Sequence, residues 1–250
     1  MLTAVATAGR RYLPRGWVDF GYQLSIWFGF LLAYQVARGF ADRDPSRAFE
    51  NGWRVLGVEQ GITNHIFELT LQRVVESSSF LNRLASLTYW LSEFAVVGLA
   101  LLWVYLRRNE SFKPFRNWIL LANVLGLVGY VLLPTAPPRM FASLGFIDTL
   151  GNLSSLNHGS GLIEVAPNPY AAMPSLHAAD ALIVGISLMS VTRHRSLRLL
   201  WALWPLWVWF CVMATANHFW LDIVGGVAVA LLALALLQSR RLLRLVPKLV

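Results

Sequence analysis

Six apolar stretches, separated by polar segments, organise the sequence. A helix needs about 20 mostly apolar residues to cross a bilayer. Stretches of this kind occupy, to within a few residues, 17–38, 84–106, 117–133, 176–192, 199–216 and 219–238. Helices satisfy their own backbone hydrogen bonds in lipid, and these stretches lack the alternating pattern of a membrane β-barrel. The pattern therefore predicts an all-α, polytopic membrane protein with six transmembrane helices.

The composition of the chain agrees with a membrane protein. Hydrophobic residues make up 56% of the 250 residues and charged residues only 14%, whereas a soluble domain has about 25% charged residues. The single cysteine, Cys211, excludes an intrachain disulfide. The start of the chain lacks the pattern of a cleavable signal peptide. We expect one integral membrane domain over residues 1–250, with a catalytic helical core at 84–238.

The basic residues indicate which side of the membrane each connection faces. The net charge is +8, and 14 of the 21 Lys and Arg residues fall in the two tails and two of the loops. These residues are Arg10, Arg11, Arg15, Arg107, Arg108, Lys113, Arg116, Arg193, Arg195, Arg198, Arg240, Arg241, Arg244 and Lys248. Cytoplasmic segments are enriched in Lys and Arg, so both tails, 1–16 and 239–250, are predicted to be cytoplasmic. The net positive charge thus reflects the orientation of the protein in the membrane and not a surface that binds nucleic acid. We expect that membrane to be the plasma membrane.

Two long segments, 39–83 and 134–175, are predicted to be extracytoplasmic. The first contains ITNHIFELTLQRVVE, residues 62–76, whose helical periodicity predicts a helix at the membrane interface. The expected apolar stripe of this helix consists of Ile62, Ile66, Phe67, Leu69 and Val74, with Glu68 and Arg73 outside it. The second segment is rich in Pro, Gly, Asn and Ser, which predicts a structured loop.

Four reactive side chains are predicted to meet at the extracytoplasmic rim. Arg139 follows the third apolar stretch in LLPTAPPRM, and His177 opens the fourth in MPSLHAAD. His218 and Asp222 lie between the fifth and sixth stretches in TANHFWLD. Each alone has an ordinary explanation, as an interfacial polar group, a lipid contact or a helix cap. Ionisable residues in membrane segments are usually functional, and their shared position favours a site.

The residue types at this rim suit phosphoryl transfer. His218 and Asp222 are four residues apart, which places them on one helix face. There the carboxylate can fix the tautomer of the imidazole for nucleophilic attack. His177 can protonate the leaving oxygen as a general acid, and Arg139 can bind phosphate oxygens. The helix start at Ser175 offers backbone N–H groups to the same anion.

Three further polar residues are candidates for contact with the substrate. Asn217 directly precedes the proposed nucleophile and is predicted to bind substrate. Asp180 lies one turn inside the fourth stretch, and we expect it to line a headgroup pocket; the alternative is a buried polar contact with a neighbouring helix. Glu93, in YWLSEFAVVG, is a second intramembrane carboxylate that could face the same cavity.

The motifs at these positions resemble those of the type 2 phosphatidic acid phosphatase superfamily. PSLH resembles the Pro-Ser-Gly-His motif of that family, with Leu176 in place of glycine, and HFWLD matches the core of Ser-Arg-x5-His-x3-Asp. The resemblance covers about residues 80–238. It implies a six-helix architecture in which His218 is the nucleophile, Asp222 its partner and His177 the acid that protonates the leaving group.

The sequence departs from the family pattern at two expected cations. If Arg139 aligns with the arginine of the first motif, Lys-x6-Arg-Pro, then Leu132 replaces the lysine and Met140 the proline. The Ser-Arg of the third motif falls on Cys211 and Val212. The chain resembles more closely the branch with the inositol phosphorylceramide synthases, which move a phosphoryl-alcohol group between lipids. Fewer cations suit a phosphodiester monoanion, because Coulomb attraction scales with the product of the charges.

Several functions fit these residues. The first expectation is a membrane lipid phosphatase, without metal or other cofactor, that hydrolyses a lipid phosphate or pyrophosphate through a phosphohistidine. By the same chemistry, a lipid phosphotransferase would pass a phosphoryl-headgroup to a lipid alcohol. A metal-dependent enzyme would instead use His177, His218 and Asp222 as zinc ligands. A transporter that binds lipid phosphate would be favoured by repeated halves or broken helices, and the sequence shows neither. The expected partners are a lipid phosphate or phospholipid and the membrane.

Overall fold

The protein is all-α within the residues that the structure describes, which are 13–40, 44–149 and 169–245. The computed structural model contains the helices α2 (Gly16–Phe40), α3 (Pro45–Thr63), α4 (Phe67–Glu76), α5 (Ser79–Leu91), η2 (Ser92–Val96), α6 (Val97–Arg107), α7 (Asn109–Leu132), η3 (Pro138–Met140), η4 (Ala142–Leu144), α8 (Leu176–Val191), α9 (Arg195–Ala214) and α10 (Trp220–Leu245). This confirms the predicted all-α class. Of the predicted tails, residues 1–12 and 246–250 lie outside the described ranges.

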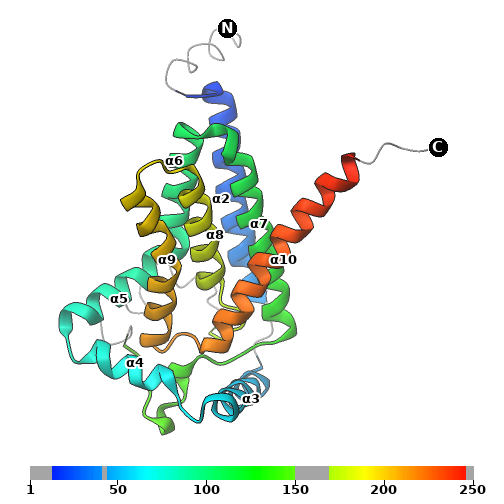
Figure 1. Cartoon of the computed structure of the whole chain (residues 1–250). Helices are drawn as coiled ribbons and strands as arrows, with labels where there is room; N and C mark the ends of the chain where they lie inside the picture. The colour runs from blue at the N-terminus through cyan, green and yellow to red at the C-terminus, as the bar shows by residue number, and fades with distance from the viewer. Residues whose placement is uncertain (1–12, 41–43, 150–168, 246–250) are drawn as a thin grey trace.

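Most of the long helices within the described residues form a bundle, and α3 and α4 lie across one of its ends (Figure 1). α2, α6, α7, α8, α9 and α10 run along the bundle, whereas α3 and α4 cross the end where α9 stops and α10 begins. α8 lies among the others and packs against α6, α7, α9 and α10. Ten of its 16 residues are buried, as expected for a helix that is apolar on all sides and surrounded by protein.

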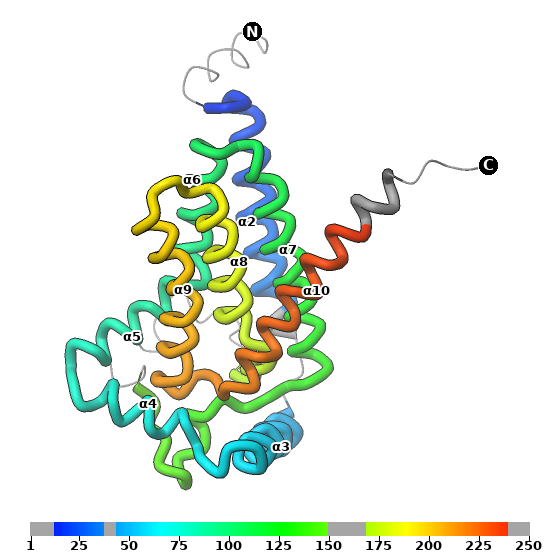
Figure 2. Tube along the Cα trace, viewed as in Figure 1, coloured from blue at the N-terminus to red at the C-terminus, as the bar shows by residue number. Residues whose placement is uncertain are grey.

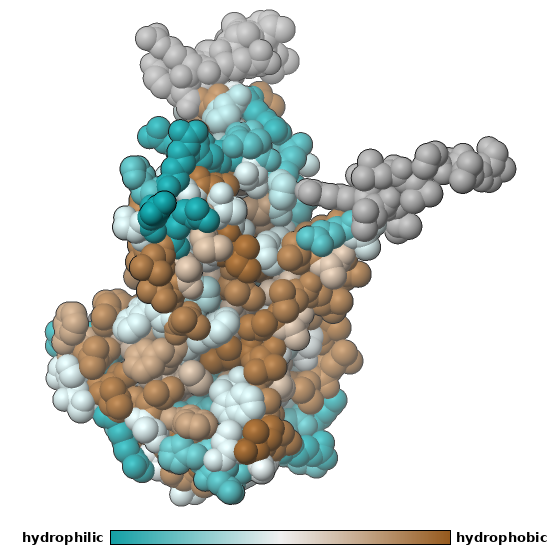
Figure 3. All heavy atoms as spheres, in the orientation of Figure 1, coloured by the Kyte–Doolittle hydropathy of each residue, from teal (hydrophilic) through white to brown (hydrophobic). Residues whose placement is uncertain are grey.

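Within the described part of the chain, four helices are long and apolar enough to cross a membrane. They are Ser79–Arg107, which includes α5, η2 and α6, together with α7, α9 and Trp220–Ser239 of α10; α8 is apolar but shorter. On the face shown in Figure 3, an apolar belt covers the middle of the bundle between more polar ends. Each of the six predicted spans corresponds to a helix of the bundle, and six membrane crossings stay a prediction.

Two glycines let the start of α8 approach its neighbours closely. A Cβ atom added at Gly129 of α7 would lie closer than 3.0 Å to the ring of Pro174, and one at Gly226 of α10 would lie closer than 3.0 Å to the carbonyl oxygen of Ser175. Small residues allow such close approach between helices in membrane bundles. The segment that leads into α8, including the cis peptide bond between Met173 and Pro174, is therefore seated between α7 and α10.

The predicted interfacial helix over residues 62–76 is wrong in two respects. The chain turns at Asn64, where φ is 52°, so that α3 ends and a separate helix, α4, begins at Phe67. Glu68, expected outside the apolar stripe, is fully buried, whereas Phe67 of the expected stripe is 45% exposed. The physical reason is that the Glu68 carboxylate accepts a hydrogen bond from the backbone N–H of Trp220, at the start of α10.

Candidate active site

Arg139, His177 and His218 meet at one small cavity, at the end of the bundle where α9 turns into α10. The volume of the cavity is about 30 Å³. Its described lining consists of Tyr89, Glu93, Tyr130, Pro137, Arg139, Pro169, Ala171, Ala172, His177, Asn217 and His218. In Figure 2 the green connection that follows α7 runs beside the orange turn between α9 and α10. The structure thus brings together residues that three separate connections supply.

The ring of His218 is held through its Nδ1 atom. Nδ1 lies 2.9 Å from the carbonyl oxygen of Ala172 and 3.5 Å from Oδ2 of Asp222. A carbonyl oxygen can only accept a hydrogen bond, so Nδ1 carries the proton and the lone pair lies on Nε2. The same carboxylate oxygen accepts the backbone N–H of Phe219 at 2.8 Å. The ring is therefore oriented for attack through Nε2, with a backbone carbonyl as its nearer partner.

His177 lies against His218 and between two residues of the Ser79–Arg107 helix. The ring centroids of the two histidines are 5.6 Å apart. Tyr89 stacks on the His177 ring at 4.4 Å with an interplanar angle of 18°, and Oε2 of Glu93 lies 3.4 Å from its Nε2. A phosphate at Nε2 of His218 would lie within reach of His177. The arrangement suits a nucleophile and a proton donor that act on one phosphorus atom.

Glu93 reaches the cavity from a local irregularity in its helix. Residues Ser92–Val96 form one turn of π-helix between α5 and α6, and such turns are frequent at functional sites. The other oxygen of the carboxylate, Oε1, accepts a bond from the hydroxyl of Tyr34 at 3.5 Å. The sequence indicated that Glu93 could face the cavity, and the structure places it there. The sequence did not indicate that Glu93 pairs with His177, because this contact joins two different helices.

Arg139 is held by the turn between α9 and α10. Its Nη1 donates to Oδ1 of Asn217 at 2.6 Å, and its backbone N–H donates to the carbonyl oxygen of Ala216 at 2.8 Å. Asn217 in turn donates through Nδ2 to the carbonyl oxygen of Thr215 at 3.1 Å. Asn217 thus positions the guanidinium group, and both side chains line the cavity that holds the histidines.

Two other predicted substrate-binding residues, Ser175 and Asp180, lie outside the described lining of the cavity. Ser175 is fully buried, and its hydroxyl oxygen caps α8 by accepting the N–H of Ala178 at 3.2 Å. Asp180 is 2% exposed, and its carboxylate accepts a bond from Nδ2 of Asn123 in α7 at 2.8 Å. The geometry of Asp180 corresponds to the alternative that the sequence left open, a buried polar contact between helices.

The two cations of the family motifs are absent from this cavity. Cys211 and Val212, at the Ser-Arg position, are fully buried in α9, and Leu132, at the lysine position, is 66% exposed. Arg139 is the only lysine or arginine among the described residues that line the cavity. The sequence did not single out Tyr130, which also lines the cavity; a tyrosine near the end of an apolar stretch was the available signal.

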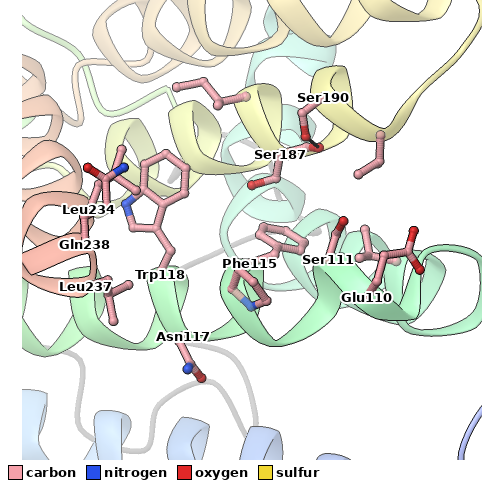
Figure 4. A pocket seen from close by; sticks show the side chains of 14 residues that line it. Glu110, Ser111, Phe115, Asn117, Trp118, Ser187, Ser190, Leu234, Leu237 and Gln238 are labelled. Carbon is pink, nitrogen blue, oxygen red and sulfur yellow. Dashed lines mark hydrogen bonds between the residues drawn. The ribbon is translucent and has the colours of Figure 1, made fainter. Parts of the chain in front are cut away.

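A larger cavity of about 510 Å³ lies among α6, α7, α8 and α10 (Figure 4). Its described lining includes Glu110, Ser111, Trp118, Ser187 and Gln238, but no histidine, lysine or arginine. Because phosphoryl transfer needs a nucleophile and positive charge at the phosphate, this larger cavity does not qualify as the site. Among the described residues, no group of three His, Cys, Asp or Glu side chains is arranged to hold a metal ion.

The chain is similar in sequence to several known proteins. The family model described as "PAP2 superfamily" matches residues 55–236. A phosphoinositol dihydroceramide synthase of Bacteroides thetaiotaomicron is 24% identical over 155 residues, which cover 57% of this chain and 50% of that protein. An inositol phosphorylceramide synthase catalytic subunit, aur1, of Schizosaccharomyces pombe is 28% identical over 137 residues, covering 48% of this chain and 31% of that protein.

The matched regions thus span half or less of these two curated relatives. The crystal structure of LpxE from Aquifex aeolicus is 18% identical and aligns with a TM-score of 0.49, covering 67% of this chain and 92% of that one. The family model spans most of the chain and includes all the histidines, carboxylates and the arginine described above. The chain belongs to the PAP2 superfamily.

Proposed function

We propose that the protein is a membrane lipid phosphotransferase that moves a phosphoryl-headgroup from a phospholipid to a lipid alcohol through a phosphohistidine at His218. The observation that carries the proposal is the pair of imidazoles from two helices, with centroids 5.6 Å apart, in a cavity that Arg139 also lines. Hydrolysis of a lipid phosphate or pyrophosphate by the same histidines is the second candidate.

In the first step, Nε2 of His218 attacks the phosphorus atom of the donor lipid. The bond between phosphorus and the leaving oxygen breaks as the N–P bond forms, and His177 gives its proton to that oxygen. Negative charge on the nonbridging oxygens is stabilised by Arg139, which Asn217 holds in place. Nδ1 of His218 keeps its proton and donates a hydrogen bond to the carbonyl oxygen of Ala172, with the carboxylate of Asp222 3.5 Å away; both oxygens stabilise the ring as it becomes positively charged.

In the second step, a hydroxyl oxygen of the acceptor attacks the phosphohistidine. The N–P bond breaks, Nε2 of His218 recovers its lone pair, and His177 takes the proton of the attacking hydroxyl. Glu93, 3.4 Å from His177, lies where it can stabilise the charged imidazolium that this transfer produces. No metal or other cofactor takes part in this scheme.

The charge of the site supports a phosphodiester as the donor. Arg139 is the single lysine or arginine among the described residues that line the cavity, and Glu93 contributes a carboxylate close by. A phosphodiester carries one negative charge, whereas a terminal phosphate carries nearly two at neutral pH, and Coulomb energy scales with the charge. One curated relative is named a phosphoinositol dihydroceramide synthase and the other an inositol phosphorylceramide synthase catalytic subunit, and these names support transfer ahead of hydrolysis.

The size of the empty cavity favours the second candidate, hydrolysis. A volume of about 30 Å³ holds about two or three water molecules, since one needs about 10–15 Å³ on this measure. A water molecule next to His177 would be a ready nucleophile for the second step. A transferase must exclude this water from the phosphohistidine until the acceptor hydroxyl arrives.

We also propose that the cavity faces the extracytoplasmic side. Arg107 ends α6, Arg195 begins α9, and Arg108 and Arg193 lie in the connections next to them, at the opposite end of the bundle from α3 and α4 (Figure 1). Since cytoplasmic loops are enriched in Lys and Arg, that end is assigned to the cytoplasm. Labelling of single introduced cysteines with a membrane-impermeant reagent in intact cells tests the orientation, with Cys211 replaced by Ala; labels near Phe67 but not near Arg195 are expected.

The function is tested with purified protein in vesicles that contain headgroup-labelled phospholipids, with and without a lipid alcohol. Transfer yields a new labelled phosphodiester lipid, and hydrolysis yields a released phosphate or phosphoalcohol. His218→Ala should abolish either product, a loss of at least about 10³-fold, and His177→Ala should lower the rate by about 10²–10⁴-fold. A labelled, alkali-stable and acid-labile protein adduct should form in wild type and be absent in His218→Ala.

The matched control is His194→Ala, which removes an exposed histidine at the start of α9 and should leave the rate unchanged. A His218→Ala protein that still forms either product would refute the mechanism. Release of phosphate with no acceptor product, across ceramide, diacylglycerol and polyprenol acceptors, would replace the transferase with the hydrolase.

A further inference from the structure

The first backbone N–H groups of α10, the helix that follows His218, are bound by the side chains of two glutamates. Both glutamates lie outside the predicted catalytic core, 84–238. The first N–H groups of a helix have no partner within it. The N–H of Trp220 donates to Oε1 of Glu68 at 2.8 Å, and the N–H of Leu221 donates to Oε1 of Glu59 at 2.8 Å. The preceding N–H, of Phe219, is bound by Asp222. Three consecutive backbone donors at the start of α10 are therefore satisfied by oxygens of three carboxyl groups.

Glu59 and Glu68 come from α3 and α4, which supply no residue to the described lining of the cavity. Both side chains have no exposed area, and the second oxygen of each carboxylate, Oε2, has no hydrogen-bond partner among the described residues. Burying a carboxyl group away from water is costly unless it is well bound. A cap by a small neutral side chain, such as Ser78 on α5, avoids this cost, so the two glutamates need another explanation.

The location of the capped donors supplies that explanation. They lie two and three residues after His218, whose own N–H donates to the carbonyl oxygen of Val212 at 3.1 Å. The turn that carries His218 is thus held from one side by α9 and from the other by the two glutamates. The position of its ring relative to Ala172 depends on both attachments.

We propose that Glu59 and Glu68 are positioning residues, which fix the start of α10 and thereby hold His218 at the distance from the phosphate that attack requires. This inference rests on the proposed function only in taking His218 as the nucleophile. A shift of about 1 Å at a reacting group can lower a rate by about 10²-fold, so a small movement of this turn is enough to matter.

The same pair makes the positioning sensitive to alkaline pH. Burial, and secondly the charge of Glu68, raises the pKa of Glu59 to about 9. Burial likewise raises the pKa of Glu68. The charged groups that face the pair are Asp222 from α10 and, on Glu68 alone, His65 from the connection between α3 and α4. Above about pH 9, Glu59 therefore loses its proton, and its negative charge is unfavourable beside the buried carboxyl groups of Glu68 and Asp222.

The test compares alanine and glutamine variants of the two glutamates. Glu59→Gln and Glu68→Gln keep a carbonyl oxygen that accepts the backbone N–H, and each should retain kcat within about threefold at neutral pH. Glu59→Ala and Glu68→Ala remove the acceptor and should lower kcat by about 10–100-fold with little change in KM. The matched controls are Glu50→Ala on α3 and Glu76→Ala on α4, which alter exposed glutamates on the same two helices.

The pH profile separates positioning from general support of the fold. Wild-type kcat should fall above about pH 9, and Glu59→Gln should lack this decline because amide groups do not ionise. Amide hydrogen exchange at residues 219–222 should be faster in the alanine variants and not in the controls. Alanine variants that keep wild-type kcat while His218→Ala is inactive would overturn the inference alone. An active His218→Ala would instead overturn the proposed function.

Discussion

Replacing Gly226 by alanine should increase the distance between His177 and His218, although neither histidine is itself changed. A Cβ atom at this position would lie closer than 3.0 Å to the carbonyl oxygen of Ser175 and 3.1 Å from its carbonyl carbon. Ordinary contacts between nonbonded heavy atoms are about 3.5–4.0 Å, so the backbone of Ser175 must retreat from α10 by on the order of 1 Å. His177 lies two residues further along α8 and moves with it. A displacement of this size lowers a rate by about 10²-fold.

The stability of the variant should change less than its activity. Overpacking destabilises by about 1–3 kcal/mol, while alanine in place of glycine in a helix recovers about 0.5–1 kcal/mol. The assay is the initial rate with labelled phospholipid in vesicles, alongside thermal unfolding in detergent. Gly225→Ala is the matched control, because its Cβ would meet only Pro174 and Met173 at 3.3 Å or more, and it should keep the rate within about threefold. A Gly226→Ala protein with wild-type kcat would refute the reasoning.

Three further outcomes follow from the site and its supports. Asp180→Asn should leave rate and lipid preference unchanged, because Asp180 binds Asn123 away from the cavity; Asp180→Ala should cost about 1–3 kcal/mol of stability in denaturant unfolding. Arg139→Lys should lower kcat/KM by about 10–100-fold in the vesicle assay, since lysine cannot reproduce a guanidinium that bonds Asn217 and phosphate together; an unchanged value would contradict this. Burial holds the proton of Glu59 in the folded state up to a pKa of about 9, against 4.5 in the unfolded chain, so the free energy of unfolding should fall as pH rises between these values, and Glu59→Gln should show a flatter dependence.

Much of the helical bundle could be predicted from the sequence alone, and so could the two histidines, His177 and His218, that meet at the small cavity. The length of an apolar stretch can be read directly from consecutive residues. Each stretch predicted in this way corresponds to a helix. The spacing of His218 and Asp222 is also local, and the two side chains do approach to 3.5 Å, although His218 lies two residues before Trp220, the first residue of α10, and not on one helix face with Asp222 as predicted. Placing Arg139 and His177 beside them required only that connections on the same side of the membrane meet. These inferences depend on distance along the chain, which the sequence states directly.

The contacts between helices were decided by the tertiary structure. Glu68 was expected to lie outside the apolar stripe, but it is buried, because its side chain accepts a hydrogen bond from the backbone N–H of Trp220, which has no partner within α10. The nearer partner of His218 is the carbonyl oxygen of Ala172, a backbone atom that no residue type reveals. Helical periodicity gives the face on which a side chain lies but not the helix opposite that face. That choice depends on how closely the helices pack, which at α8 is set by Gly226 and its contact with Ser175.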